Sequence, residues 1–369
     1  MKITKFFALL CASAMAFVGC TPNDEPSKEP QPETSGKLTL TADKTAVSLG
    51  ETVTFKVEQE GVDVTDLATI YDSSMTKVDG AKFTPVESGS YEFFATKGSE
   101  SSNNLKITVL ASMPTLPEDP EPANTTFNHR VLIIDHTGVN CGYCPKATDN
   151  LKALAETEWH NYYNEVTCHA GSYASGDPAN SAAANALNAV QSKYITGYPS
   201  IVVNFSKPCE NYLSSSIQSV LKTAVKKDGV DVGVALAVSG DNTSVYCAAQ
   251  VKSGKDQEYK VVAWLLESNI YSPNQSGATK DYHKIYNYAL RNIAGEYSKT
   301  NVLGESVGVI AAGETMDFAF ELPIISTKWM YENMDVLVIV STKDANGSWD
   351  VANSAMCHIG ESKPYEYVK

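Results

Sequence analysis

Hydrophobic and polar positions alternate along the first part of the chain, between residues 37 and 112. Val53, Phe55 and Val57, for example, are separated by threonine and lysine. An alternation with a period of two is typical of β-strands that bury one face. Turn-forming residues such as Gly50 separate these runs at strand-length intervals. The pattern therefore predicts a β-sandwich of short strands over this region, serving as a spacer or an adhesion module.

The pattern changes after a proline-rich stretch at residues 113–126, which we interpret as a linker between domains. Residues 131–134 form an uninterrupted apolar run, as expected for a strand that is covered on both faces. Apolar residues then recur at helical spacing behind Pro145, a residue that fits the first turn of a helix. We therefore expect an α/β domain over residues 127–227. Its further elements are predicted as a strand at 164–173, a helix at 179–194, a strand at 200–205 and a helix at 214–225.

Alternation with a period of two returns after residue 228 and continues through several runs up to residue 341. A tyrosine-rich segment at residues 281–293 interrupts these runs and is expected to be helical. The simplest interpretation is a second β-sandwich over residues 228–369. The predicted fold class is thus a multidomain α+β protein, with an α/β domain between two sandwiches.

The N-terminus carries an uncharged apolar stretch, residues 6–18, behind two lysines. The stretch is too short to span a bilayer comfortably. It ends in the sequence Phe-Val-Gly-Cys, which resembles the lipobox of bacterial lipoproteins. By that resemblance, residues 1–19 are a signal peptide and Cys20 carries fatty acyl chains such as palmitate. An ordinary secretory signal with an incidental cysteine stays the alternative.

Residues 20–36 are rich in proline and acidic residues and have almost no apolar side chains, so we expect a solvated tether. Acidic residues just behind Cys20 resemble the surface-export signal of lipoproteins in some Gram-negative anaerobes. The expected location is therefore the outer membrane, through the lipid on Cys20. The resemblance favours the cell surface, and the periplasmic face stays open.

The formal charge of −14 and the isoelectric point of about 4.9 argue against nucleic-acid binding, which needs clustered lysine and arginine. The chain has eight cysteines. One cysteine lies in the predicted signal peptide, Cys20 is the expected lipidation site, and two form a C-x-x-C pair. An oxidising envelope permits structural disulfides among the other four. A disulfide between Cys247 and Cys357 and buried free thiols are both open. The four remaining cysteines are Cys168, Cys209, Cys247 and Cys357.

The candidate chemistry lies at Cys141 and Cys144, which follow the apolar run and precede a predicted helix. Two thiols at this spacing can close a small disulfide, and the first of them is biased toward thiolate at a helix start. Asp135 lies six residues before the first cysteine, and Tyr198-Pro199 precedes a later strand. Together these residues resemble the active site of thioredoxins, so the α/β domain is expected to be thioredoxin-like.

The resemblance implies a role for each of these residues. Cys141 would be the nucleophile, Cys144 the resolving thiol and Asp135 a general base for Cys144. Pro199 would be a cis-proline, and the backbone of Tyr198 would pair with a substrate chain. The expected site therefore needs neither a cofactor nor a metal ion.

Zinc binding is the competing use of a C-x-x-C motif, with Cys168 and His169 as further ligands. A second matching knuckle is missing from the sequence, so the redox interpretation is preferred. We interpret His169 as a structural or pocket-edge residue. His136 is next to Asp135 and could lie near the disulfide, without a catalytic role.

A longer string, from Asp135 through Thr137-Gly138 and both cysteines to Pro145, is similar to the hallmark of a narrower group. This group is the outer-membrane-protein-28-related lipoproteins of Gram-negative anaerobes. The sequence His169-Ala170-Gly171 and, more weakly, residues 283–291 also look like that group. The resemblance covers residues 128 to the end, and the first sandwich is then an extra Ig-like module.

Two functions of different classes follow. The first is a lipid-anchored oxidoreductase that exchanges thiols and disulfides with cysteine-containing envelope or surface proteins. The second is a surface adhesin or ligand-binding lipoprotein in which Cys141–Cys144 is a static disulfide. Whether the protein is an enzyme therefore depends on whether this disulfide turns over.

Overall fold

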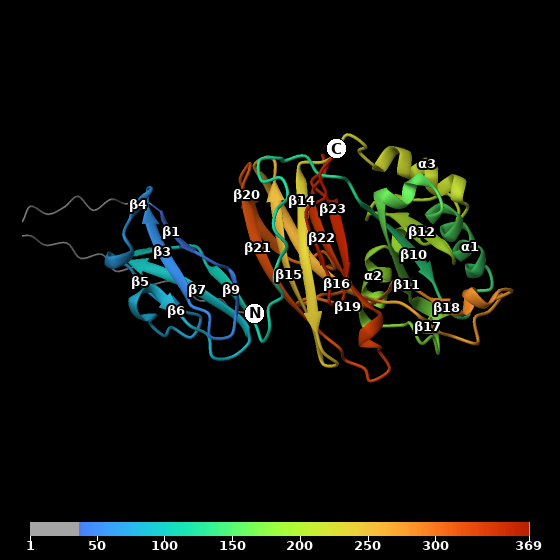
Figure 1. Ribbon diagram of the computed structural model, residues 1–369, viewed down its shortest axis with the longest axis horizontal. Helices are drawn as coiled ribbons and strands as arrows, with labels where there is room; N and C mark the ends of the chain where they lie inside the picture. Colours follow the sequence, from blue (N-terminus) through green and yellow to red (C-terminus); the bar gives the residue numbers. More distant parts are fainter. Residues whose placement is uncertain (1–36, 369) are drawn as a thin grey trace, which may run out of the picture. The chain divides into compact units, whose positions relative to one another are not determined.

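The computed structural model describes residues 37–368 (Figure 1). The predicted signal peptide and the whole predicted tether, with the lipidation site Cys20, lie outside these residues. Among the described helices, none has the length and apolar character needed to cross a lipid bilayer.

Residues 37–112 form two small sheets that enclose one hydrophobic core. Leu38, Phe55 and Phe93 are among the buried side chains of this core and come from both sheets. The alternating pattern of the sequence therefore does form strands here. The first sheet contains β1 (Leu38–Ala42), β3 (Val53–Gln59), β4 (Val62–Asp63) and β6 (Lys82–Phe83). The second contains β2 (Ala46–Ser48), β5 (Thr69–Asp72), β7 (Gly89–Lys97), β8 (Glu100–Ser101) and β9 (Leu105–Leu110).

The largest sheet has nine strands and joins the middle of the chain to its last third. Eight of its strands follow the order β13-β12-β10-β11-β19-β16-β22-β23. The ninth strand, β20, also pairs with β16. From the middle of the chain come β10 (Val131–Thr137), β11 (Tyr163–His169), β12 (Ser200–Val203) and β13 (Lys207–Pro208). From the last third come β16 (Gln257–Glu267), β19 (Ala289–Ile293), β20 (Ser306–Ile310), β22 (Met334–Lys343) and β23 (Trp349–His358).

A four-stranded sheet lies against the second half of the nine-stranded sheet. The two sheets bury a core that includes Val234, Cys247, Val336 and Cys357. A separate strand pair, β17 (Ile270–Tyr271) and β18 (Ile285–Tyr286), brackets a long loop. The four-stranded sheet contains β14 (Val232–Gly240), β15 (Ser244–Ser253), β21 (Thr315–Pro323) and β24 (Ser362–Lys363).

Three α-helices cover the first half of the nine-stranded sheet within the described part of the chain: α1 (Cys144–Ala155), α2 (Ala182–Val190) and α3 (Ser214–Ala224). The helices α1 and α3 pack on one face of β10 and β12, and α2 packs on the opposite face (Figure 1). Pro145 follows Cys144 at the start of α1, where its missing N–H is not needed. The segment expected to be helical at residues 281–293 forms instead a short 3-10 helix, η6 (Asp281–Lys284), followed by β18 and β19.

The predicted fold class is wrong. We expected a central thioredoxin-like α/β domain, but the described fold is mostly β and this domain does not exist as a separate unit. The strand β11 pairs in parallel with β19 of the last third: Thr167 lies opposite Ala289, and its N–H donates to the carbonyl of Tyr288 at 2.9 Å. The sequence could not reveal this because the partner strand lies 120 residues downstream. The domain boundaries themselves stay a prediction.

Candidate functional site

Cys141 and Cys144 are joined by a disulfide at the start of α1. Both side chains are buried, with exposed fractions of 1% and 2%. The N–H of Cys144 donates to Sγ of Cys141 at 3.1 Å. After reduction, this N–H and the helix N-terminus would stabilise a thiolate on Cys141. The local geometry is therefore compatible with Cys141 as the nucleophile of the pair.

The strands β10 and β11 place acidic side chains beneath this disulfide. Successive side chains of a strand point to opposite faces, so Asp135 lies on the α1 face together with Glu165 and Thr167. Asp135 and Glu165 line a polar cavity of about 60 Å³, and Cys144 lines the same cavity. A space of this size holds a few water molecules. The second cysteine of the pair thus shares a small cavity with two carboxyl groups.

Burial favours the protonated form of both carboxyl groups. Burial, and secondly the charge of Glu165, raises the pKa of Asp135 well above its usual range. Oδ1 of Asp135 accepts no hydrogen bond from any described residue. Burial raises the pKa of Glu165 to about 7. Buried carboxyl groups with raised pKa values are typical of sites that transfer protons.

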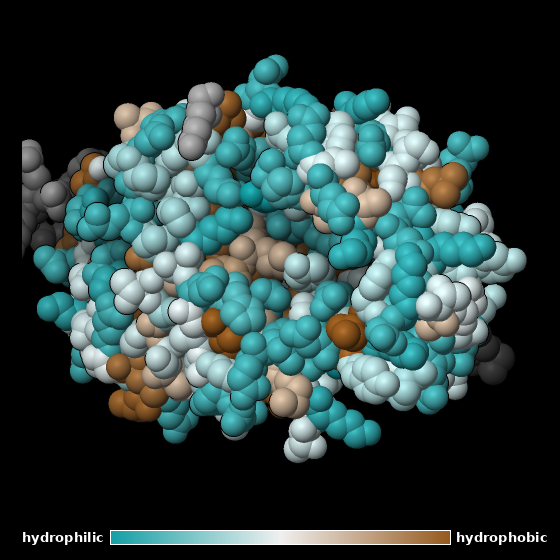
Figure 2. Space-filling model, turned by 45° about the vertical axis from the view of Figure 1, so that its right-hand side comes forward, coloured by the Kyte–Doolittle hydropathy of each residue, from teal (hydrophilic) through white to brown (hydrophobic). Residues whose placement is uncertain are grey.

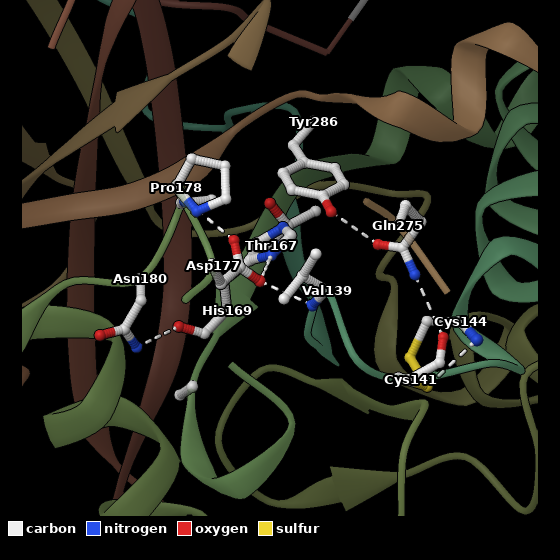
Figure 3. A network of polar contacts seen from close by, with 12 residues as sticks. Val139, Cys141, Cys144, Thr167, His169, Asp177, Pro178, Asn180, Gln275 and Tyr286 are labelled. Carbon is white, nitrogen blue, oxygen red and sulfur yellow. Dashed lines mark hydrogen bonds and ion pairs between the residues drawn. A yellow bond between two sulfur atoms is a disulfide. The ribbon is translucent and has the colours of Figure 1, made fainter. Parts of the chain in front are cut away.

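A buried hydrogen bond between His169 and Asp177 fixes the loop in front of the disulfide (Figure 3). His169 and Asp177 are 2.8 Å apart between Nδ1 and Oδ2. The same carboxylate accepts a hydrogen bond from the N–H of Val139 at 2.7 Å. Burial alone would raise the pKa of Asp177, but the hydrogen bond from His169 and the charge of His169 lower it overall. The pair therefore ties β11 to the residues that lead into Cys141.

A loop from the last third of the chain covers the disulfide. We call residues 272–284 the cap. Nε2 of Gln275 donates to the carbonyl of Cys141 at 3.1 Å, and Oε1 of Gln275 accepts from the hydroxyl of Tyr286 at 2.7 Å (Figure 3). The N–H of Ser276 donates to the carbonyl of Val139 at 2.8 Å. These contacts explain why both cysteines are buried.

The fit of the cap on the disulfide loop requires a glycine. Gly277 has φ +72°, a backbone conformation that residues with a Cβ rarely adopt. A Cβ at this position would lie 2.1 Å from the carbonyl oxygen of Gly142, between the two cysteines. Any side chain at residue 277 would therefore push the cap away from the disulfide.

A cluster around Asp149 fastens the far end of the cap to α1. Oδ1 of Asp149 accepts from Nζ of Lys280 at 2.9 Å, from Nε2 of His283 at 2.9 Å and from the hydroxyl of Tyr282. Burial would raise the pKa of Asp149, but these hydrogen bonds hold it well below its usual range. The N–H of Thr279 donates to Nδ1 of His283, which places the proton of the imidazole on Nε2. We call these residues the Asp149 cluster.

The remaining predicted site residues lie outside the cavity. The Tyr198-Pro199 peptide bond is cis. The hydroxyl of Tyr198 donates to the carbonyl of Ala170 and to Oδ1 of Asn188, and its ring stacks on Tyr173. None of the hydrogen bonds of Tyr198 within residues 37–368 reaches the disulfide. The catalytic roles proposed for Tyr198 and Pro199 stay predictions.

His136 and Cys168 point to the opposite face of the sheet. Nε2 of His136 donates to Oε1 of Gln191, and burial lowers the pKa of His136 to about 4. The thiol of Cys168 donates to the carbonyl of Ala184 on α2. Cys168 therefore does not meet the cysteine pair, and the geometry does not assemble the zinc set that we considered.

The cysteines of the last third are free thiols. Cys247 and Cys357 lie in the core between the two larger sheets, and no disulfide joins them. Burial raises the pKa of both thiols, that of Cys357 to about 11. Of the two alternatives left open for Cys247 and Cys357, the disulfide is wrong and the buried free thiols are correct.

Sequence reasoning missed several residues of the site, among them Glu165, Gln275 and Asp149. Glu165 carried a signal, because a charged residue inside an apolar strand is uncommon and its spacing from Thr167 places both on one face. Gln275 carried none, because it lies 134 residues from Cys141. Asp149 looked like an ordinary polar residue on the exposed side of a helix.

Comparison with known proteins gives one family match. Residues 187–363 match the family model of outer membrane protein Omp28, which supports a relationship to the outer-membrane-protein-28-related family. The matched segment contains the cap and ends close to the end of the chain, but it begins after Cys141 and Cys144. No curated protein matches the chain.

Solved structures resemble the chain only distantly. HBP35 of Porphyromonas gingivalis is 17% identical, with a TM-score of 0.49, over 65% of this chain and 78% of that chain. β-Glucosidase 3B from Thermotoga neapolitana is 13% identical, with a TM-score of 0.20, over 38% of this chain and 18% of that chain. Neither likeness is close enough to carry an argument about function.

Proposed function

We propose that the chain is a lipid-anchored outer-membrane protein related to Omp28, whose Cys141–Cys144 pair exchanges disulfides with cysteine-containing envelope or surface proteins. One observation carries the second part of this proposal. Cys144 shares a small cavity with Asp135 and Glu165, two carboxyl groups with raised pKa values. A disulfide that only holds a loop together needs no proton donor beside it, whereas a disulfide that opens and closes does.

The exchange begins with a thiolate of the client protein. It attacks Sγ of Cys141, the bond between the two sulfur atoms breaks, and Cys144 leaves as a thiolate. Neutral Asp135 lies in the same cavity and donates the proton that Cys144 takes up. A second client thiolate then attacks the client sulfur of the mixed disulfide and releases Cys141. Two electrons have moved from the client dithiol to the pair, and the reverse sequence oxidises the pair.

The cap sets a condition for this exchange. Both sulfur atoms are buried, and a client must approach along the axis of the bond that breaks. The hydrogen bonds of Gln275 and Ser276 must therefore open before a client can reach Cys141. We infer that exchange in the free protein is limited by the opening of the cap.

The second candidate function is a surface adhesin or ligand-binding protein in which the disulfide is static. The burial of both cysteines under the cap favours this candidate. Figure 2 shows one face that is largely hydrophilic, with apolar residues in small separate groups. Binding through this face would therefore rest on polar contacts rather than on one continuous apolar patch.

An exchange assay with the full chain separates the two candidates. The Cys144→Ser variant keeps the thiol of Cys141 but has no resolving thiol, so a peptide disulfide should accumulate on it as a stable mixed disulfide. The matched Cys141→Ser variant, with the buried Cys144 thiol alone, should trap at most a small fraction of that amount. Equal trapping by both variants, or by neither, would support the static disulfide.

The anchor needs a separate test. The Cys20→Ser variant should fail to incorporate radiolabelled palmitate and should leave the outer-membrane fraction. Protease added to intact cells should degrade the wild-type protein if the anchor holds it at the cell surface, and should spare it if the protein faces the periplasm. Palmitate incorporation into Cys20→Ser would contradict the proposed lipidation site.

A further inference from the structure

A second cavity, of about 280 Å³, lies between the end of α3 and the strands of the nine-stranded sheet. It is separate from the disulfide and from the cap. Its volume is just below the range of drug-sized ligand sites, which begins at about 300 Å³, so it suits only a small molecule. The side chains that decide what this cavity can hold are His129, Lys207, Lys226, Asp231, Asp344 and Asp350.

His129 directs a hydrogen-bond donor into this cavity. The side chain is buried, with an exposed fraction of 4%. The N–H of Lys226 donates to Nδ1 of His129 at 3.0 Å, so the ring proton is on Nε2. Nε2 has no hydrogen-bond partner among residues 37–368. Burial, followed by the charges of Lys226 and Lys207, lowers the pKa of His129 to about 4, so the ring is neutral at neutral pH.

The acidic groups around the cavity are already satisfied. Asp350 accepts hydrogen bonds from the N–H groups of Phe205 and Val351 and from Oγ of Ser206. Its Oδ2 also lies 3.4 Å from Nζ of Lys207. The carboxylate of Asp350 is therefore not free to attract a cation.

The other two carboxylates are satisfied in the same way. Asp231 forms an ion pair with Lys255 at 3.1 Å. Asp344 accepts the N–H groups of Asn346 and Ser348 in its own turn. The donors that lack an acceptor within the described residues are thus Nε2 of His129 and the ammonium group of Lys226.

We propose that this cavity binds a small organic anion, with a carboxylate or phosphate group held by Nε2 of His129 and the ammonium group of Lys226. Nε2 of His129 has no protein acceptor among the described residues and is accessible from the cavity, so an anionic oxygen can accept its N–H in place of water. The positive field that acts on His129 favours the same charge on the ligand. This site does not depend on the cysteine pair or on the redox proposal.

Histidine side-chain NMR tests the site directly, because the chain has only six histidines. Inorganic phosphate and succinate are added separately to the full chain at neutral pH, with sodium chloride at equal ionic strength as the reference. The signal of His129, assigned from its loss in His129→Gln, should shift with a saturable dependence on at least one of the two anions. The anion that shifts it identifies which group, phosphate or carboxylate, the site prefers.

Two lysine variants distinguish a built site from general attraction by positive charge. Lys226→Gln keeps the backbone N–H that orients His129, and it should weaken binding by roughly fivefold to tenfold. The matched control is Lys227→Gln, because Nζ of Lys227 lies over Trp159 and near Glu158 instead. Absence of a saturable shift with both anions, or an equal loss in both variants, would overturn the proposal.

Discussion

The two faces of β10 and β11 differ in what their side chains do. On the α2 face, Leu132, Ile134 and Val166 are fully buried in an apolar core. On the α1 face, the same two strands carry Asp135 and Glu165, which line a small cavity. The apolar residues of the α2 face supply stability, although His136 and Cys168 lie on that face as well. The carboxyl groups of the α1 face are buried at some cost to stability. Such a cost points to function at the α1 face.

Truncation on the apolar face should give the largest effect on stability. We expect Leu132→Ala to lower the free energy of unfolding by about 3 kcal/mol, because it leaves a cavity in a fully buried core. Chemical denaturation monitored by tryptophan fluorescence measures this change. The matched variant on the other face, Asp135→Asn, should change the free energy of unfolding by less than about 1 kcal/mol, since the protonated carboxyl group and the amide have the same shape. A loss as large as that of Leu132→Ala would show that Asp135 is structural.

A pH series on Glu165 sharpens the same comparison. Folding raises the pKa of Glu165 from an ordinary value of about 4.3 to about 7, so the neutral carboxyl group stabilises the fold at low pH. This stabilisation is lost as the pH rises through about 7. Glu165→Gln is neutral at every pH and should therefore match the wild type near pH 4. Above about pH 7 it should be more stable by about 2 kcal/mol, after allowance for solvent screening.

Denaturation curves at several pH values decide whether this difference exists. A difference between Glu165→Gln and the wild type that stays constant with pH would contradict the raised pKa of Glu165. It would also remove one of the two carboxyl groups on which the proton-transfer argument rests.

Disrupting the Asp149 cluster should have a smaller effect than the substitutions above. It should change the rate at which the Cys141–Cys144 disulfide is reduced rather than the stability of the fold. Asp149→Ala removes the acceptor of three hydrogen bonds that hold the cap on α1. We expect the disulfide to be reduced by dithiothreitol about tenfold faster, because a partly exposed cluster of this kind contributes about 1.4 kcal/mol. Alkylation of the released thiols followed by mass spectrometry measures the rate.

A second variant in the cap controls for charge. Asp281 forms a 3.7 Å ion pair with Lys284 inside the cap. Asp281→Ala should therefore leave the rate unchanged. Equal rates of disulfide reduction in the wild type, Asp149→Ala and Asp281→Ala would mean that the cap does not limit access to the disulfide.

The sequence predicted the local features of the site better than its setting. Alternating and helical patterns located most strands and the helix behind Cys144, because these patterns depend on neighbouring residues. The thioredoxin resemblance singled out Asp135, and its carboxyl group does line the same cavity as Cys144. The cap and the pairing of β11 with β19 could not be predicted, because they join residues more than 100 positions apart. The separate α/β domain was wrong for this same reason.

The reduction potential of the Cys141–Cys144 pair in the full chain tests the central claim most directly. The protein is equilibrated in glutathione buffers of defined potential, and the fraction of reduced pair is measured by alkylation and mass spectrometry. Our account predicts a potential between roughly −120 and −270 mV, the range of proteins that exchange disulfides. A potential below roughly −300 mV, as in structural disulfides, would contradict it.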